Sequence, residues 1–142
     1  MMWAPKRTIV ALVIGLAAIP PRALAAEAGP FDGTWNVALS CQATSGLNAY
    51  AYQFTATVAS GLLHGEYGTP GHPSSVSLDG TIEPTGTAAL FAKGLSGEPD
   101  HRFTNPPQSA PYAYRVTARF DGSQGTGSRV QGGNCNFTFV KQ

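Results

Sequence analysis

Few residues in this sequence have the type and spacing that a catalytic centre needs. Gly-x-Ser-x-Gly, the usual setting of a nucleophilic serine, is absent although glycine and serine are abundant. The acidic residues that could act in pairs on a glycoside are Glu66, Asp79, Glu83, Glu98 and Asp100. Asp79 and Glu83 precede glycine and proline, as turn residues do, and no spacing links any two of the five. We therefore expect the protein not to be an enzyme.

The histidines offer no convincing metal site. His64, His72 and His101 do not lie at a close ligand spacing such as His-x-x-x-His. His64 and Glu66 fall on one face of "LHGEYG" and could supply two ligands, but the alternate residues, beginning with Leu63, form the apolar face, so we expect the polar pair to face water. The glycines of "DGSQGTGSRVQGG" lack the Gly-Lys-Ser/Thr that a phosphate-binding loop requires. We predict no metal and no cofactor.

Four tyrosines are the best candidates for ligand binding: Tyr50, Tyr52, Tyr112 and Tyr114. Each brings apolar area together with a hydroxyl group that needs a partner when buried. Either they fill a core, which is the simpler interpretation, or they line a cavity that is open at one end. We expect Tyr52 to be core and leave Tyr114 open, because a long loop precedes its strand.

That loop, "SGEPDHRFTNPPQSA" at 96–110, is a candidate interaction surface. Phe103 is an apolar residue beside Arg102, and two prolines follow it, a composition suited to presenting a contact residue to a protein partner. The alternative is a plain flexible connection.

The elements that must position these residues are strands. Apolar residues recur with period two rather than with helical spacing, and glycine or proline interrupts the chain too often for helices of normal length. The predicted strands are 34–41, 49–59, 62–67, 74–82, 87–95, 111–120, 125–130 and 135–140.

One internal similarity connects two of these strands. "YAYQFTATV" at 50–58 matches "YAYRVTARF" at 112–120 at five of nine positions, and Gly65 and Gly127 stay aligned at the same offset of 62. A duplicated hairpin and convergence on one burial pattern both explain this. In either case the two strands should occupy similar environments.

The N-terminal residues have the features of an export signal. Lys6 and Arg7 precede an apolar run that is too short to cross a bilayer, and small residues at signal-cleavage spacing follow it. We predict a signal peptide at 1–25, with cleavage as late as residue 28 as the alternative, and one domain at 26–142. Cleavage leaves six basic residues against eight acidic ones, which argues against nucleic acid or anionic lipid as a partner. We expect a periplasmic or secreted protein, with no membrane contact after cleavage.

Two cysteines in an exported chain favour a disulfide, here Cys41–Cys135, over two free thiols. If the first and last strands pair with these cysteines opposite each other, Val37 faces Phe139 and Leu39 faces Phe137, so the apolar faces match without using the cysteines. First-to-last pairing closes about eight antiparallel strands into an up-and-down barrel. A sandwich of two sheets, joined by the disulfide at its edge, is the alternative.

"FDGTW" before a strand, together with the closing "FTFVK", resembles the ends of small calycin-type barrels, which include lipocalins and avidins. The resemblance implies an all-β barrel with a lumen that could carry a small apolar molecule. Avidins use several pocket tryptophans, whereas only Trp35 follows the predicted signal, so biotin is not expected. The sequence also resembles small exported inhibitors of proteases and lysozymes, which are eight-stranded barrels held by a disulfide. The sequence therefore favours a non-enzymatic carrier of a small apolar ligand, with a protein-interaction module or hydrolase inhibitor that acts through its loops as the alternative.

Overall fold

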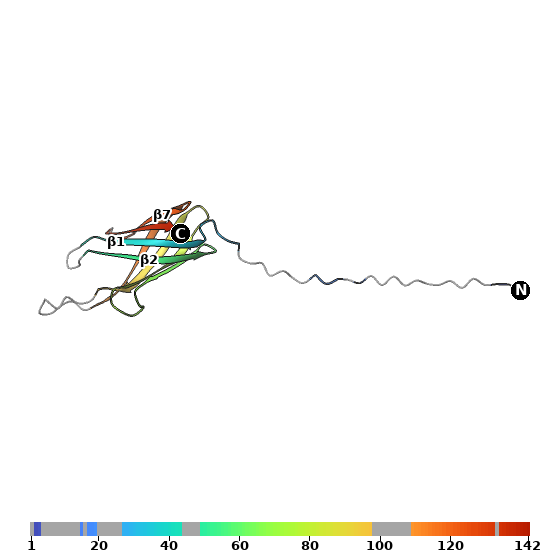
Figure 1. The fold of residues 1–142 in the computed structure, drawn as a ribbon, viewed down its shortest axis with the longest axis horizontal. Coiled ribbons are helices and arrows are strands. Elements are labelled where there is room, and N and C mark those ends of the chain that lie inside the picture. The colour runs from blue at the N-terminus through green and yellow to red at the C-terminus, as the bar shows by residue number, and fades with distance from the viewer. Residues whose placement is uncertain are drawn as a thin grey trace.

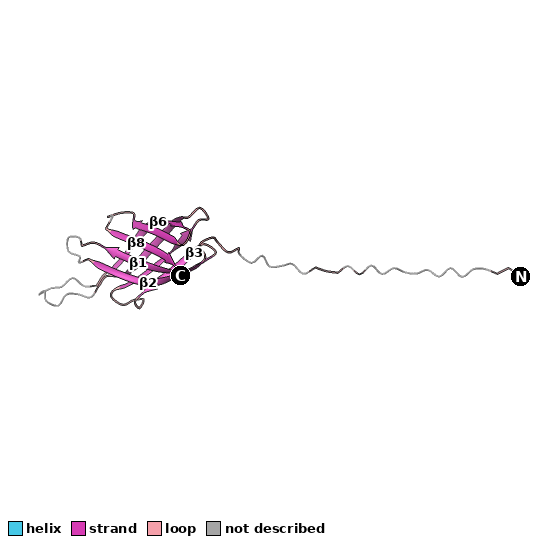
Figure 2. Ribbon diagram, turned by 45° about the horizontal axis from the view of Figure 1, so that its top comes forward, coloured by secondary structure: helices cyan, strands magenta, loops and turns pink. Residues whose placement is uncertain are grey.

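The chain forms one closed antiparallel β-barrel in a computed structural model, which describes residues 2–3, 15, 17–19, 27–43, 49–97, 109–132 and 134–142 (Figure 1). Its strands are β1 (Gly33–Cys41), β2 (Tyr50–Ala59), β3 (Leu62–Tyr67), β4 (Ser75–Ile82), β5 (Thr87–Leu95), β6 (Pro111–Asp121), β7 (Gln124–Arg129) and β8 (Cys135–Lys141). Each strand pairs with the next, and β8 pairs with β1, so the sheet closes on itself (Figure 2). The predicted eight-stranded barrel is confirmed, and the sandwich alternative is wrong.

The closing pair of strands has the register that their sequences predict. Along β1 and β8, Val37 lies opposite Phe139 and Leu39 opposite Phe137. Cys41 faces Cys135, and the two form a disulfide across 94 residues. The alternative of two free thiols is therefore wrong. A disulfide is consistent with an oxidising, extracytoplasmic environment.

Side chains fill the middle of the lumen and one of its ends. The largest fully buried side chains come from five of the eight strands, and they include Trp35, Val37, Leu39, Leu63, Val76, Leu78, Val116, Phe120, Phe137 and Phe139. At the filled end, the Trp35 ring meets the Phe120 ring edge to face at 5.1 Å, and Phe120 also packs on Phe139. Most of the barrel is therefore core.

The "FDGTW" segment closes this filled end. Phe31 is buried against Phe120, and the Trp35 indole donates a 2.9 Å hydrogen bond to the Phe31 carbonyl oxygen. The Asp32 carboxylate accepts hydrogen bonds from the backbone N–H groups of Ser60 and Gly61, in the turn between β2 and β3. These bonds hold the pKa of Asp32 below its ordinary value. The motif thus fixes the entry of the chain into β1.

The connections at the two ends of the barrel differ in length. At the Trp35 end, tight turns of two to four residues join β2 to β3, β4 to β5 and β6 to β7. At the opposite end lie all four longer connections, residues 42–49, 68–74, 96–110 and 130–134. Connections of this kind most often carry binding residues, because they tolerate variation while the sheet holds their ends in place.

The predicted signal peptide at 1–25 lies almost entirely outside the described residues. In the described part of the chain, no helix has the length and apolar character needed to cross a membrane.

Candidate functional site

Five tyrosines gather at the end of the barrel that carries the longer connections. We call them the tyrosine mouth: Tyr50 and Tyr52 from β2, Tyr67 from β3, and Tyr112 and Tyr114 from β6. The Tyr52 and Tyr67 rings stack at 4.3 Å, and the Tyr112 and Tyr114 rings are nearly parallel at 5.9 Å. The mouth is therefore an aromatic surface that continues the core toward solvent.

The four tyrosines singled out in the sequence do come together, but their burial differs from expectation. Tyr114 is 7% exposed and belongs to the buried core, whereas Tyr50, Tyr52 and Tyr112 are partly buried at its edge. We expected Tyr52 to be the core residue. Strand alternation predicts which face a residue occupies but not how far along the barrel axis it lies, and Tyr114 lies deeper than the residues that flank the opening.

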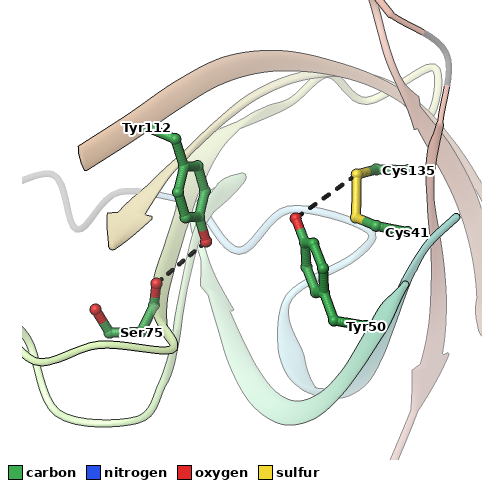
Figure 3. The surroundings of a disulfide bond; sticks show 5 residues. All are labelled: Cys41, Tyr50, Ser75, Tyr112 and Cys135. Carbon is green, nitrogen blue, oxygen red and sulfur yellow. Dashed lines mark hydrogen bonds between the residues drawn. A yellow bond between two sulfur atoms is a disulfide. The ribbon is translucent and has the colours of Figure 1, made fainter. Parts of the chain in front are cut away.

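The hydroxyl groups of the tyrosine mouth differ in their hydrogen bonding. Tyr112 donates a 3.1 Å hydrogen bond to the Ser75 carbonyl oxygen, and the Tyr50 hydroxyl lies 3.9 Å from the Cys135 sulfur (Figure 3). The Tyr114 hydroxyl is buried without a hydrogen-bond partner. Burial raises the pKa of both Tyr112 and Tyr114, so both hydroxyl groups keep their protons at neutral pH. The Tyr50 hydroxyl approaches that of Tyr114 without making a hydrogen bond of normal geometry.

Arg129, which lies on β7, contacts the tyrosine mouth. Its alternation with Gly125 and Gly127 places it on the inward face, and the centre of its guanidinium lies 4.6 Å from the centroid of the Tyr114 ring. Its positive charge acts to lower the pKa of Tyr50 and of Tyr114, against the larger effect of burial. Arg129 is therefore close to both phenol groups.

Tyr67 and Arg129 were both missed as site residues, although the internal similarity could have found them. They are separated by the same offset of 62 that aligns Gly65 with Gly127. Extending the repeat by two residues makes Tyr67 and Arg129 equivalent, and the structure pairs them equivalently, Tyr67 with Tyr52 and Arg129 with Tyr114. The glycines before Arg129 concealed its inward orientation, because a glycine pattern has no apolar face.

A hollow of about 680 Å³ adjoins the mouth. Tyr67 and Tyr112 belong to both, and the other described lining residues come from β3 to β6 and the connection after β3: Glu66, Pro70, Gly71, Ser75, Val76, Ser77, Lys93, Gly94, Leu95, Pro111 and Ala113. The Ser77 hydroxyl is buried there without a hydrogen-bond partner. Hollows of this size are typical of small-molecule sites.

His64 and Glu66 lie on the outer face of β3, as expected, and their side chains are about half exposed. The His64 Nδ1 atom lies 2.5 Å from an Asp79 carboxylate oxygen on β4, and Nε2 lies 3.4 Å from Glu66. The assignment of Asp79 and Gly80 to a turn is wrong, because both lie inside β4. In the part of the chain that the structure describes, no three potential ligands are arranged to hold a metal ion.

Arg102 and Phe103, the candidate interaction residues, lie outside the described residues. The base of their loop is described, however. Ser96 and Ala110 are joined by two hydrogen bonds, and the Ser109 hydroxyl donates to the Gly97 carbonyl oxygen. These contacts fix both ends of the connection beside the hollow.

Comparison with protein-family models, with curated proteins and with solved structures found no match. The structure shows the barrel architecture. No match supports membership of the calycin-type families.

Proposed function

We propose that this protein is an exported, non-enzymatic binding protein that holds a small apolar or aromatic molecule at the tyrosine mouth and in the adjoining hollow. The observation that carries the proposal is the contrast between the two ends of the barrel. One end is filled by Trp35 and the phenylalanines around it, whereas the other presents five tyrosine rings beside a hollow of about 680 Å³. Tyrosine offers both an apolar ring and a polar tip, which suits a ligand held at the edge of water.

The filled lumen corrects the simplest carrier hypothesis. A ligand buried in the middle of the barrel would have to displace Leu39, Val116 or Phe137, all of which are fully buried. Binding at the mouth requires no such displacement, because Tyr50, Tyr52, Tyr67 and Tyr112 are only partly buried. We therefore place the ligand across the mouth and the hollow rather than within the core.

A hydrolase inhibitor or protein-interaction module is the second candidate. The observation that favours it is the hydrogen-bonded base of the 96–110 connection, which holds both ends of a long loop at the same rim. Such a partner would be an extracytoplasmic protein, and the loop rather than the mouth would form the contact.

Titration with a neutral apolar dye such as Nile red tests the carrier function. We expect saturable fluorescence enhancement, and we expect Tyr67→Ala to weaken binding about tenfold, because this ring stacks on Tyr52 and also lines the hollow. Phe91→Ala is the matched control, since Phe91 is an exposed aromatic residue on the outer face of β5. No saturable binding, or equal losses in both variants, would leave the interaction module as the better proposal.

A further inference from the structure

One charged residue of the described strands, Arg129, lies against the tyrosine mouth. Among the inward-facing residues of the eight strands, Arg129 and Lys141 are the only ones that carry charge, and Lys141 lies at the other end with its amine over Trp35. Arg129 forms no ion pair with any carboxylate of the described residues. An inward-facing arginine without an acidic partner is uncommon, because charges removed from water are normally paired.

Two hydrogen-bond donors at this site have no partner. The Nε atom of Arg129 and the hydroxyl group of Tyr114 are both buried and make no hydrogen bond. Each such group costs free energy, so native proteins seldom leave them unmatched away from a functional site. Here the two belong to residues in direct contact, since the guanidinium lies over the Tyr114 ring.

The contact of the guanidinium with the Tyr114 ring leaves its N–H groups able to bind a ligand. A guanidinium that packs on a ring uses its flat face, while its N–H groups point outward in its own plane. That edge is the fork which matches the two oxygens of a carboxylate. The Tyr114 hydroxyl, whose proton burial retains, can donate a further hydrogen bond.

We propose that the tyrosine mouth recognises the carboxylate of a small aromatic or apolar acid through Arg129 and Tyr114, an inference that rests on the proposed function. The apolar body of the ligand then lies against Tyr52 and Tyr67, toward the hollow. One positive charge matches the single negative charge of a carboxylate. A phosphate group carries more charge, and the other basic residue near this site, Lys93, lines the hollow from the outward-facing side of β5 rather than the mouth.

The internal repeat supports this polarity across the mouth. The β2–β3 and β6–β7 hairpins lie four strands apart in an eight-stranded ring, so they occupy opposite sides of the barrel. At equivalent positions one side has Tyr67 stacked on Tyr52, and the other has Arg129 over Tyr114. One wall is thus purely aromatic and suits the body of the ligand, while the other is cationic and suits its acid group.

The test compares 2-naphthoate with its neutral isostere 2-naphthamide at pH 7 by calorimetry. We expect the parent protein to bind naphthoate at least about tenfold more tightly than the amide, the usual effect of one charge-assisted contact. Arg129→Gln should weaken naphthoate binding about tenfold more than it weakens amide binding, and so remove this preference. Arg115→Gln, which removes an outward-facing and exposed charge from β6, is the matched control and should retain the preference.

Folding of each variant is checked by the fluorescence of Trp35 at the opposite end. Arg129→Tyr is the second variant, since tyrosine already occupies the equivalent position 67, and it should also lose the preference. Equal binding of acid and amide would overturn the carboxylate assignment and leave the proposed function standing. Tighter binding of 2-naphthyl phosphate than of naphthoate would likewise overturn it. If neither naphthyl compound nor the neutral dye binds, the proposed function fails, and this inference fails with it.

Discussion

At the residue scale, two neighbouring tyrosines show how differently the same side chain can contribute to stability. Tyr112 and Tyr114 are two positions apart on β6 with nearly parallel rings. The Tyr112 hydroxyl donates to the Ser75 carbonyl oxygen and so ties β6 to the start of β4. The Tyr114 hydroxyl is buried without a partner. A satisfied hydroxyl contributes modestly to folding, whereas an unsatisfied buried one opposes it.

Removing each hydroxyl should therefore have effects of opposite sign. We expect Tyr112→Phe to lower the free energy of unfolding by about 1 kcal/mol, and Tyr114→Phe to leave it unchanged or to raise it by about 1 kcal/mol. Urea unfolding followed by Trp35 fluorescence measures both. Because the two substitutions are chemically identical on one strand, each is the control for the other. Equal destabilisation by both would show that the Tyr114 hydroxyl is hydrogen-bonded in the free protein.

His64 provides a pH-dependent contact on the outer surface. The hydrogen bond to Asp79, followed by the charges of Asp79 and Glu66, raises the pKa of His64 above 6.5. The folded state therefore holds the proton more tightly, and the stabilisation is fully present below pH 6.5 and is lost as the pH rises through the folded pKa.

We expect the parent to exceed His64→Gln in unfolding free energy at about pH 5.5, by less than about 1 kcal/mol because the side chains are about half exposed. The difference should shrink toward pH 8. Urea unfolding at both values measures it, with Asp79→Asn as the partner control. A difference that grows with pH would contradict this sign.

The sequence predicts the orientation of the tyrosines but not every contact that the candidate residues make. Strand alternation correctly placed Tyr50, Tyr52, Tyr112 and Tyr114 on one face, because a period of two fixes which side of a sheet a residue occupies. It could not find the contact between His64 and Asp79, which depends on how β3 aligns with β4. That these four tyrosines share one end of the barrel follows from the predicted topology, because β2 and β6 run in the same direction and each has its tyrosines at its start.

At the element scale, the two similar hairpins use glycine in the same way. Gly65 on β3 pairs with Ala56 on β2, and Gly127 on β7 pairs with Ala118 on β6. A Cβ atom at Gly65 would lie 2.8 Å from the Ala56 Cβ, and one at Gly127 would lie 2.9 Å from the Ala118 Cβ. The repeated hairpins thus share one packing feature, a missing side chain opposite an alanine, although Tyr114 is more buried than its equivalent Tyr52.

Alanine at either glycine should overpack the lumen. We expect Gly65→Ala and Gly127→Ala each to lower the free energy of unfolding by about 1–3 kcal/mol, the usual cost of an extra carbon in a packed core. Gly97→Ala is the control, because a Cβ there would make only an ordinary contact with Ser74, and we expect a change within about 0.5 kcal/mol. Urea unfolding compares the three, and a cost at Gly97 equal to those in the hairpins would contradict the packing explanation.

The order of the strands was predictable because several local signals agree. Each predicted range overlaps a strand of the structure, and the turn after β4 has the fixed φ of Pro84 and the positive φ of Gly86 that its sequence indicates. The pairing of β1 with β8 followed from matching Val37 and Leu39 to phenylalanines. Longer connections lack such constraints, and their composition alone does not predict what they contact.

At the scale of the whole molecule, the two ends of the barrel are stabilised by different means. At one end, the "FDGTW" segment and the rings of Trp35, Phe120 and Phe139 exclude water by packing. At the other, the disulfide joins β1 to β8 directly beside the tyrosine mouth, where the Tyr50 hydroxyl approaches the Cys135 sulfur. Packing supplies most of the core, so the mouth can stay partly open while the covalent bond holds its rim.

Removing the bridge should therefore weaken the fold and loosen the mouth while the barrel itself persists. For a loop of 94 residues, the chain-entropy model predicts that Cys41→Ala with Cys135→Ala lowers the free energy of unfolding by about 4–5 kcal/mol. Urea unfolding measures this loss, and far-ultraviolet circular dichroism should still report the native β-structure. Binding of the neutral dye should weaken more than the fluorescence of Trp35 changes, because the bridge lies at the tyrosine end. Thiol labelling of the unreduced, denatured parent must find no free cysteine. Two labelled thiols in the parent, or an unfolding curve unchanged by the double substitution, would show that the covalent bond does not hold this rim.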